Sequence, residues 1–321
     1  MLPLRAGDTR MTLRTLTVGT RGSALAMTQT ESVIASLRTL HPGLEVRVQR
    51  ITTKGDVMRD VPLARIGGRG VFVDAIEDAL RERAIDVAVH SAKDLPSRVP
   101  EDLTIAAFLE RADPRDVLVS RTGRLLDLAP GARVGTSSQR RVSLIRALRP
   151  DLQTSDLRGN VDTRLRKLDA GDYDAIVLAG AGLTRLGLTS RVTEWLPVDS
   201  FLPSPGQGAL AIEVRADDAE LRTLIRPLAH AATEAALAAE RAFLAQLGVG
   251  CAAAVGAYAS VGRGDRLTLR AMIGAPDGRS VRGEATDRIA RATQLGESLA
   301  ERLLATGGRA LVDECERGSI V

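Results

Sequence analysis

The sequence has few aromatic residues and few cysteines, and each shortage argues against a class of protein. Aromatic residues make up 2% of the 321 residues, which is too few for the stacking surfaces that bind single-stranded nucleic acid. The two cysteines, Cys251 and Cys315, cannot form a disulfide framework, so a reducing compartment fits the chain. We therefore expect a cytoplasmic protein that binds no nucleic acid.

A targeting segment and a membrane span are also lacking. The N-terminus has no apolar run of signal-peptide length, and we expect residues 1–11 to form an extension in which Met11 is an alternative start. One uncharged stretch, residues 242–262, is long enough to span a membrane. Because this stretch is rich in alanine and glycine, it predicts the end of a helix, a loop and a strand. We expect no membrane span.

Lysine is scarce, whereas arginine is abundant. Lysine occurs only at Lys54, Lys93 and Lys167, so 41 of the 44 basic residues are arginine. A GC-rich genome would account for most of this excess. Arginine binds carboxylates and phosphates through two parallel hydrogen bonds, which lysine cannot form. The positions of the arginines are therefore more informative than their number.

The most informative stretch is residues 87–96, with the sequence VAVHSAKDLP. Its small and β-branched apolar residues predict a buried strand, and Pro96 prevents continuation of that strand. Four polar residues stand at the strand end: His90, Ser91, Lys93 and Asp94. Ligands bind at the carboxyl ends of strands in open α/β sheets. We therefore interpret the cluster as a functional site rather than as a solvated turn.

A strand, a Gly-Thr turn and a helix start occur twice in the chain. The first copy is a strand at 15–18 followed by GTRGSALA at 19–26, and the second is RVGTSS at 133–138. A helix that starts at a strand end presents backbone N–H groups and a positive dipole end to an anion. The repetition predicts a duplicated, doubly wound architecture with a cleft between its halves.

Six arginines lie just beyond predicted strand ends. They are Arg21, Arg140, Arg141, Arg158, Arg164 and Arg185. A single arginine at such a place would be typical of a solvated helix face. Six in one topological position indicate instead a ligand that carries several carboxylates or phosphates.

Two segments interrupt the periodic pattern and predict crossings between domains. Apolar periodicity lapses at 110–116, and the turn-rich segment FLPSPGQG occupies 201–208 before a strand at 209–214. Two crossings return the chain to its first domain. An Ala-rich helix at 231–247 then begins a small third domain. The expected domains are 12–110 with 209–228, then 115–203, and finally 229–321.

Seven motifs, taken in their order and spacing, resemble the porphobilinogen deaminase (hydroxymethylbilane synthase) family from about residue 16 onward. They are GTRGSALA at 19–26, VHSAKDLP at 89–96, GTSSQRR at 135–141, LRGNV at 157–161, AGLTRL at 181–186, PGQG at 205–208 and GC at 250–251. The resemblance implies two doubly wound domains of the periplasmic-binding-protein type. It also implies a small C-terminal α/β domain with a three-stranded antiparallel sheet.

The resemblance also implies the chemistry. The family carries a dipyrromethane cofactor, joined to a cysteine that matches Cys251 by a thioether, and each pyrrole bears an acetate and a propionate. It condenses four porphobilinogens head to tail, releases ammonia and hydrolyses the product to hydroxymethylbilane. The family's catalytic carboxylate matches Asp94. We expect a transferase that acts as a monomer and uses no metal.

The remaining family positions map onto this chain as binding residues. Cofactor-binding positions match Ser23, Lys93, Asp94, Thr136, Ser137, Ser138, Arg140, Arg141, Arg158, Arg185 and Gln207. Substrate-binding positions match Arg21, Ser23, Arg158, Arg164 and Arg185. Asp56 and Phe72 match positions near the site.

One departure from the family lies directly after the cofactor cysteine. The chain has AAAVG at 252–256, where the family commonly has Gln-Val-Pro-Ile-Gly, and loss of the proline makes the loop less rigid. Cys315 matches no family motif. The alternative function is a solute-binding module without catalysis, but such a module would have no use for Asp94 combined with Cys251.

Overall fold

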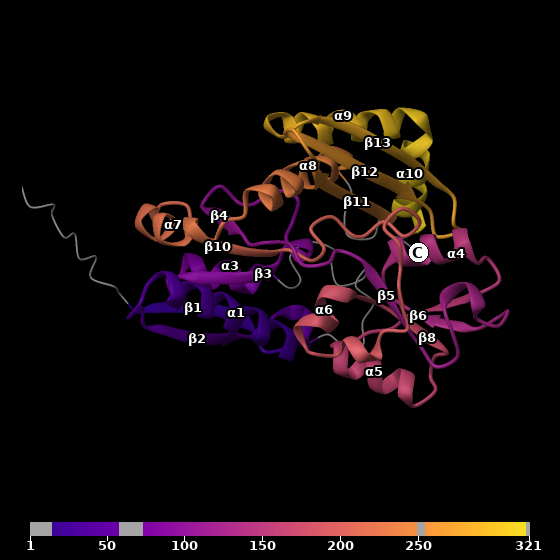
Figure 1. Cartoon of the computed structure of the whole chain (residues 1–321), viewed down its shortest axis with the longest axis horizontal. Coiled ribbons are helices and arrows are strands. Elements are labelled where there is room, and N and C mark those ends of the chain that lie inside the picture. The colour runs from indigo at the N-terminus through magenta and orange to yellow at the C-terminus, as the bar shows by residue number, and fades with distance from the viewer. Residues whose placement is uncertain (1–14, 58–72, 249–253, 319–321) are drawn as a thin grey trace, which may run out of the picture.

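The structure is a computed structural model that describes residues 15–57, 73–248 and 254–318. These residues form two five-stranded sheets and one three-stranded sheet. In Figure 1 the first sheet lies at the left, the second at the lower right and the third above them.

The first sheet has the strand order β2-β1-β3-β10-β4. Its strands are β1 (Leu16–Arg21), β2 (Val46–Ile51), β3 (Val87–Ser91), β4 (Leu103–Phe108) and β10 (Leu210–Arg215). Strand β1 is parallel to both β2 and β3, whereas β10 is antiparallel to both β3 and β4. The strand β10 therefore enters the sheet from the second crossing, as predicted.

The second sheet repeats this arrangement with the order β7-β6-β8-β5-β9. Its strands are β5 (Asp116–Ser120), β6 (Arg133–Gly135), β7 (Gln153–Ser155), β8 (Ala175–Ala179) and β9 (Glu194–Trp195). Here β6 is parallel to β7 and β8, and β5, which enters from the first crossing, is antiparallel to β8 and β9. The predicted duplicated α/β architecture is confirmed.

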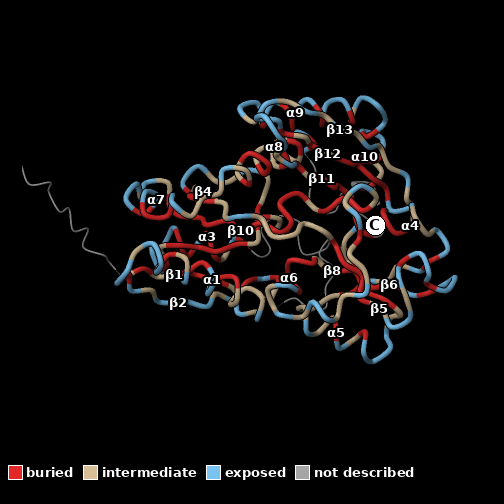
Figure 2. Tube along the Cα trace, viewed as in Figure 1, coloured by how far each residue is buried: buried red, intermediate tan, exposed pale blue. Residues whose placement is uncertain are grey.

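Helices follow the strands of each five-stranded sheet. The first sheet is accompanied by α1 (Ala24–Leu40), α2 (Lys54–Val57), α3 (Asp74–Arg81) and α7 (Ala219–Ile225), and the second by α4 (Gln139–Leu148), α5 (Val161–Asp169) and α6 (Gly180–Arg185). Serine hydroxyls cap two of these helices, since Ser23 accepts from the backbone N–H of Ala26 and Ser138 from that of Arg141. Figure 2 shows buried residues along the sheets and exposed residues on the outer faces of the helices.

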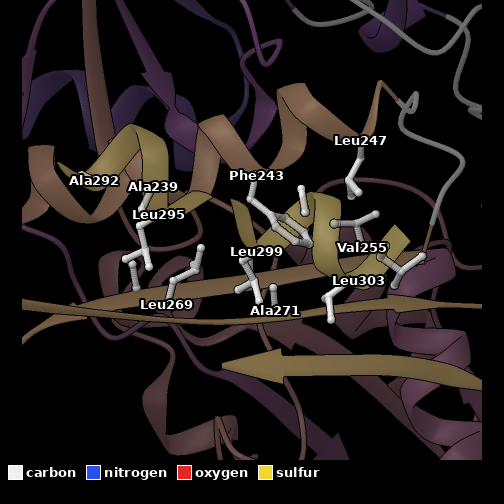
Figure 3. Packing of buried hydrophobic residues seen from close by; sticks show 14 of the residues in the cluster. Ala239, Phe243, Leu247, Val255, Leu269, Ala271, Ala292, Leu295, Leu299 and Leu303 are labelled. Atoms are coloured by element: carbon white, nitrogen blue, oxygen red, sulfur yellow. The ribbon is translucent and has the colours of Figure 1, made fainter. Parts of the chain in front are cut away.

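The third sheet is antiparallel, with the order β11-β12-β13. Its strands are β11 (Ala254–Val261), β12 (Arg266–Gly274) and β13 (Ser280–Arg288), and its helices are α8 (Ala231–Leu247), α9 (Ala292–Leu303) and α10 (Arg309–Gly318). Phe243, Leu299 and Leu269 meet in one apolar cluster between the helices and the sheet (Figure 3). A Cβ on Gly296 would lie 2.2 Å from the carbonyl oxygen of Ala239, so glycine permits the close packing of α9 on α8. The predicted three-stranded antiparallel sheet is confirmed.

The two crossing segments pack on each other and on the end of β3. Gly206 and Gly208 both have positive φ, at +75° and +92°, a conformation that glycine adopts without strain. A Cβ would lie 2.9 Å from the backbone carbon of Ala92 at Gly206, and 2.5 Å from the carbonyl oxygen of Ala112 at Gly208. The glycines of the PGQG motif therefore allow the second crossing to lie against both neighbours.

The uncharged stretch 242–262 forms the end of α8 and the strand β11, in agreement with the sequence-based expectation, while residues 249–253 lie outside the described residues. Among the helices of the described chain, none is long and apolar enough to cross a membrane.

Candidate active site

Asp94 and Lys93 lie directly beyond the carboxyl end of β3. Residues Ala92–Asp94 form a 3₁₀ turn after Ser91, and the backbone N–H of Ala92 donates to the carbonyl of Ala209 at 3.0 Å. Asp94 is exposed, whereas Lys93 is half-buried. The second crossing therefore fixes the backbone from which the proposed catalytic carboxylate projects.

The other two polar residues of this stretch face partners elsewhere. His90 is buried and its Nε2 lies 3.0 Å from Oε2 of Glu213 on β10, and Ser91 is hydrogen-bonded to Gln29 on α1. His90 and Ser91 therefore join β3 to its neighbours and do not contribute to the cluster around Asp94.

Lys93 points toward the second crossing. Its ammonium donates to Oε1 of Gln207 at 3.4 Å. Burial lowers the pKa of Lys93 to about 8, with a further decrease from Arg141 and Arg140, while Asp94 and Asp116 act in the opposite direction. Lys93 is therefore close to its titration midpoint at mildly alkaline pH.

Arg140 and Arg141 share one buried carboxylate, that of Asp116. Arg140 donates from Nη1 to Oδ2 of Asp116 at 2.7 Å, and Arg141 donates from Nε and Nη2 to Oδ1 at 3.1 and 2.7 Å. Burial alone would raise the pKa of Asp116, but the two guanidiniums outweigh burial and lower it well below its ordinary value. Asp116 is thus a permanent anion at the first residue of β5.

Gln207 joins this ion cluster to Lys93. Its side-chain amide donates to the carbonyl of Pro114 at 2.8 Å and to Oδ1 of Asp116 at 3.0 Å, while its oxygen accepts from Lys93. Because both amide hydrogens are engaged within the protein, Gln207 acts in this structure as a bridge between the two sheets.

Arg158 and Arg164 lie in the loop and helix after β7. The Nη1 atom of Arg158 is buried and has no hydrogen-bond partner among the described residues, whereas Arg164 donates from Nε to the carbonyl of Gly159 at 2.7 Å. Burial lowers the pKa of Arg164 to about 10, Arg141 and Arg158 add to the decrease, and Asp94 is among the groups that oppose it. The charges of Asp94 on the first sheet and Arg164 on the second therefore interact.

Arg21 is held within the first sheet. It donates from Nε and Nη2 to the carboxylate of Asp56 at 3.2 and 2.5 Å, and the hydroxyl of Thr53 donates to the same carboxylate at 2.7 Å. Burial alone would raise the pKa of Asp56, but Arg21 and Thr53 lower it below its ordinary value. The predicted anion-binding arginine therefore already has a carboxylate partner.

Arg185, the last residue of α6, reaches the second crossing instead of solvent. Its Nη2 donates to the carbonyl of Gly208 at 2.7 Å, and burial lowers its pKa.

The three hydroxyl residues at the start of α4 shape the turn between β6 and that helix. Thr136 accepts the backbone N–H of Ser138 at 3.2 Å, Ser137 donates to the carbonyl of Leu157 at 2.5 Å, and Ser138 caps the helix. Their side-chain bonds in this structure are all within the second sheet. Cys251 and Phe72 lie outside the described residues.

Comparison with known proteins identifies the family. A family model described as "Porphobilinogen deaminase, dipyromethane cofactor binding domain" matches residues 16–223, and one for the C-terminal domain matches 235–305. The chain belongs to the porphobilinogen deaminase family. The expected enzyme class, a transferase with a dipyrromethane cofactor, is thereby confirmed.

Individual relatives support this assignment over nearly the full length. A porphobilinogen deaminase from Roseiflexus sp. (strain RS-1) is 55% identical, over 93% of this chain and 99% of that protein. One from Syntrophobacter fumaroxidans is 48% identical, over 96% of this chain and 100% of that protein. Among solved structures, the periplasmic aliphatic sulphonate binding protein SsuA from Escherichia coli is similar with a TM-score of 0.40 and 16% identity, covering 72% of this chain and 70% of that chain.

The described residues fit the acidic groups of a dipyrromethane. The buried, unpartnered Nη1 of Arg158 lacks an acceptor, and a carboxylate supplies one. Each guanidinium has five N–H groups, of which the bonds described here occupy two in Arg140 and three in Arg141. The remaining N–H groups of both arginines can serve further carboxylates.

Two residues of this region were not predicted from the sequence. Asp116 opens the apolar strand DVLVS, and a carboxylate in that position was a usable signal. Glu240 is fully buried in α8, where it accepts from Arg111, from the N–H of Gly206 at 2.7 Å and from the N–H of Ala259 at 2.8 Å. One acid thus ties both crossings to the third sheet, and its only signal in sequence is its place in an Ala-rich helix.

Proposed function

We propose that Asp94 transfers the protons in the porphobilinogen deaminase reaction and that cations of the second sheet hold the acidic side groups of cofactor and substrate. The observation that supports this proposal most strongly is the interaction of Asp94 with Arg164 across the two sheets. An exposed carboxylate at the end of β3 and a group of arginines beyond the second sheet thus act on the same space.

Asp94 is suited to two successive proton transfers. It donates a proton to the amino group that leaves porphobilinogen, and it accepts the proton that a ring carbon loses when the new carbon–carbon bond has formed. The carboxyl group therefore ends each addition in the state in which it began. General acid–base catalysis of this kind contributes about 10²–10⁴-fold to a rate.

The binding groups divide the acidic side chains among them. The dipyrromethane, when bound, supplies the pyrrole carbon to which the first porphobilinogen is joined. Arg158 offers its buried Nη1, and Arg140 and Arg141 offer their remaining N–H groups. The proposed site also includes Arg21, Ser23, Lys93, Thr136, Ser137, Ser138, Arg164, Arg185 and Gln207, with Cys251 as the point of attachment.

Intact-mass measurement tests the attachment. Protein purified from cells that make porphobilinogen is expected to carry the mass of two linked pyrroles on the peptide that contains Cys251, and Ehrlich's reagent is expected to colour it. Cys251→Ala removes both signals. The matched control is Cys315→Ala, because Cys315 is buried at α10 and its thiol donates to the carbonyl of Gly274. Fully active enzyme with an unmodified Cys251 contradicts the proposal.

We propose in addition that the substrate is porphobilinogen and that the enzyme is a cytoplasmic monomer with domains at 12–110 with 209–228, 115–203 and 229–321. Separate apolar clusters within the first and third sheets support the domain limits. Light scattering on the purified protein tests the monomer, and a dimer mass contradicts it.

A further inference from the structure

The carboxylate of Asp116 is the centre of the polar network between the two five-stranded sheets. Asp116 is fully buried at the start of β5. It accepts hydrogen bonds from Arg140 at 2.7 Å, from Arg141 at 2.7 and 3.1 Å and from Gln207 at 3.0 Å. Through Gln207, this network reaches Lys93, which precedes Asp94.

We propose that Asp116 is a positioning residue that orients Arg140 and Arg141 and, through Gln207, holds Lys93 for the acidic groups of the ligand. This inference rests on the proposed function, because it assumes that these cations bind carboxylates. Asp116 itself is buried behind them and is assigned no contact with substrate or cofactor.

The hydrogen-bond geometry supports an orienting role. Arg140 is fixed between Asp116 and the carbonyl of Leu202, both at 2.7 Å from Nη1, and Arg141 is fixed between Asp116 and the carbonyl of Val177 at 2.9 Å. Both guanidiniums are therefore immobilised before a ligand arrives. Pre-organised donors lose less conformational freedom when they bind a carboxylate.

The charge balance supports the same role. The charged groups that act on Lys93 are Asp94, Asp116, Arg140 and Arg141. The two arginines disfavour the protonated lysine, and Asp116 is one of the two carboxylates that favour it. Without Asp116, three cations would face one another with Asp94 alone to balance them, so Lys93 would lose its proton at a lower pH.

The test compares Asp116→Asn with Asp86→Asn. Asp86 is a matched control because it also binds an arginine, Arg215 at 3.2 Å, and accepts the N–H of Thr17 at 2.9 Å. It precedes β3 and so lies at the opposite end of that strand from Asp94. The chain has only three lysines, so ¹³C-lysine NMR resolves Lys93, with Lys54→Arg and Lys167→Arg to assign the other two signals.

We expect Asp116→Asn to lower the pKa of Lys93 by about one unit, because a nearby opposite charge is lost. We also expect the KM for porphobilinogen to rise about tenfold, equivalent to the loss of one charge-assisted hydrogen bond, with a smaller change in kcat. Asp116→Glu, which keeps the charge, restores the Lys93 pKa at least in part. Asp86→Asn lowers the thermal midpoint but leaves the KM and the Lys93 pKa at wild-type values.

An unchanged Lys93 pKa or a wild-type KM in Asp116→Asn overturns the inference, as does an equal change in Asp86→Asn. If Asp116→Asn does not fold, Gln207→Leu takes its place, because that variant keeps the Asp116 ion pairs and removes only the link to Lys93. Wild-type Lys93 pKa and KM in Gln207→Leu overturn the inference too. Absence of dipyrromethane from wild-type Cys251 would instead refute the proposed function, whereas the Lys93 titration can be read in cofactor-free protein.

Discussion

The two five-stranded sheets share one strand order, yet equivalent strand ends carry different groups. In the first sheet, β3 is followed by a 3₁₀ turn that presents the exposed Asp94. In the second, β8 is followed by the glycine-rich start of α6, where a Cβ on Gly180 would lie 2.3 Å from the ring of Trp195. The fold was repeated, but the proposed proton-transfer group occurs in only one copy.

The strands that enter from the crossings differ in the same way. Strand β10 begins with Leu210 opposite Ser91, and β5 begins with Asp116 opposite Ala179. Both residues are buried, so this fold accepts an apolar residue at that position. A buried ion pair is weak evidence for stability, and the comparison therefore favours a role for Asp116 in arranging arginines over a role in folding.

The largest effect is expected where the first sheet is unique. Asp94→Asn keeps the size of the side chain but removes the charge and the exchangeable proton, so we expect turnover to fall at least about 10²-fold. Because Asp94 is exposed, the thermal midpoint should stay near that of the wild type. Asp94→Glu serves as the control and should retain more activity. Steady-state rates and cofactor mass decide the matter, and near wild-type turnover by Asp94→Asn would assign proton transfer to another residue.

The second sheet should respond to arginine changes in two distinct ways. Arg158→Lys removes a donor that has no partner among the described residues, so we expect a normal fold and a KM raised about tenfold. Arg140→Lys also breaks bonds to Asp116 and Leu202, and should cost about 1–3 kcal/mol of unfolding free energy as well. Thermal unfolding and steady-state kinetics of both variants test the contrast. Equal stability of the two variants would contradict it.

The repeated architecture was predictable because it is written in local signals. Short apolar strands, Gly-Thr turns and serine caps are read from neighbouring residues, and the structure confirms them at Gly19–Thr20 and Gly135–Thr136. The return of β10 to the first sheet followed from two breaks in periodicity. These features depend on sequence distances of a few residues.

The partners of the polar side chains could not be predicted in the same way. Arg140 meets Asp116 across 24 residues, Arg21 meets Asp56 across 35, and Gln207 meets Asp116 across 91. Such pairs depend on which strand ends the tertiary fold brings together. Sequence reasoning located the arginines at strand ends correctly, but it left all of them open to a ligand, whereas several are already bound to carboxylates or carbonyls.

A smaller effect is expected from pH, since it acts through the one lysine between the sheets. With the pKa of Lys93 at about 8, the ammonium is present below that pH and lost above it. Attraction for carboxylates is lost together with the charge, so the KM should rise about three- to fivefold between pH 7 and pH 9. Lys93→Arg, which stays charged over this range, should remove the rise. A KM that rises equally in both enzymes would show that another group titrates.

The smallest effect is expected from a matched pair of buried threonines, one after each Gly of the repeated turn. Thr20 donates its hydroxyl to the carbonyl of Ala26 at 3.3 Å, and this carbonyl also serves the helical bond within α1. Thr136 instead accepts the backbone N–H of Ser138 at 3.2 Å. A backbone donor left without an acceptor costs about 1–3 kcal/mol, more than a shared carbonyl that loses one of two donors.

Hydrogen exchange measured by mass spectrometry separates these two cases, because it reports local opening of each helix. In Thr136→Val, we expect amides at the start of α4 to exchange about tenfold faster, equivalent to about 1.4 kcal/mol. In Thr20→Val, those at the start of α1 should change about twofold at most. Thr39→Val is the control, because this threonine is exposed on α1 and bonds only within its own helix, to Ala35. Equal protection in the two Val variants would mean that the repeated turns are energetically alike, and the difference between the sheets would then be confined to their charged groups.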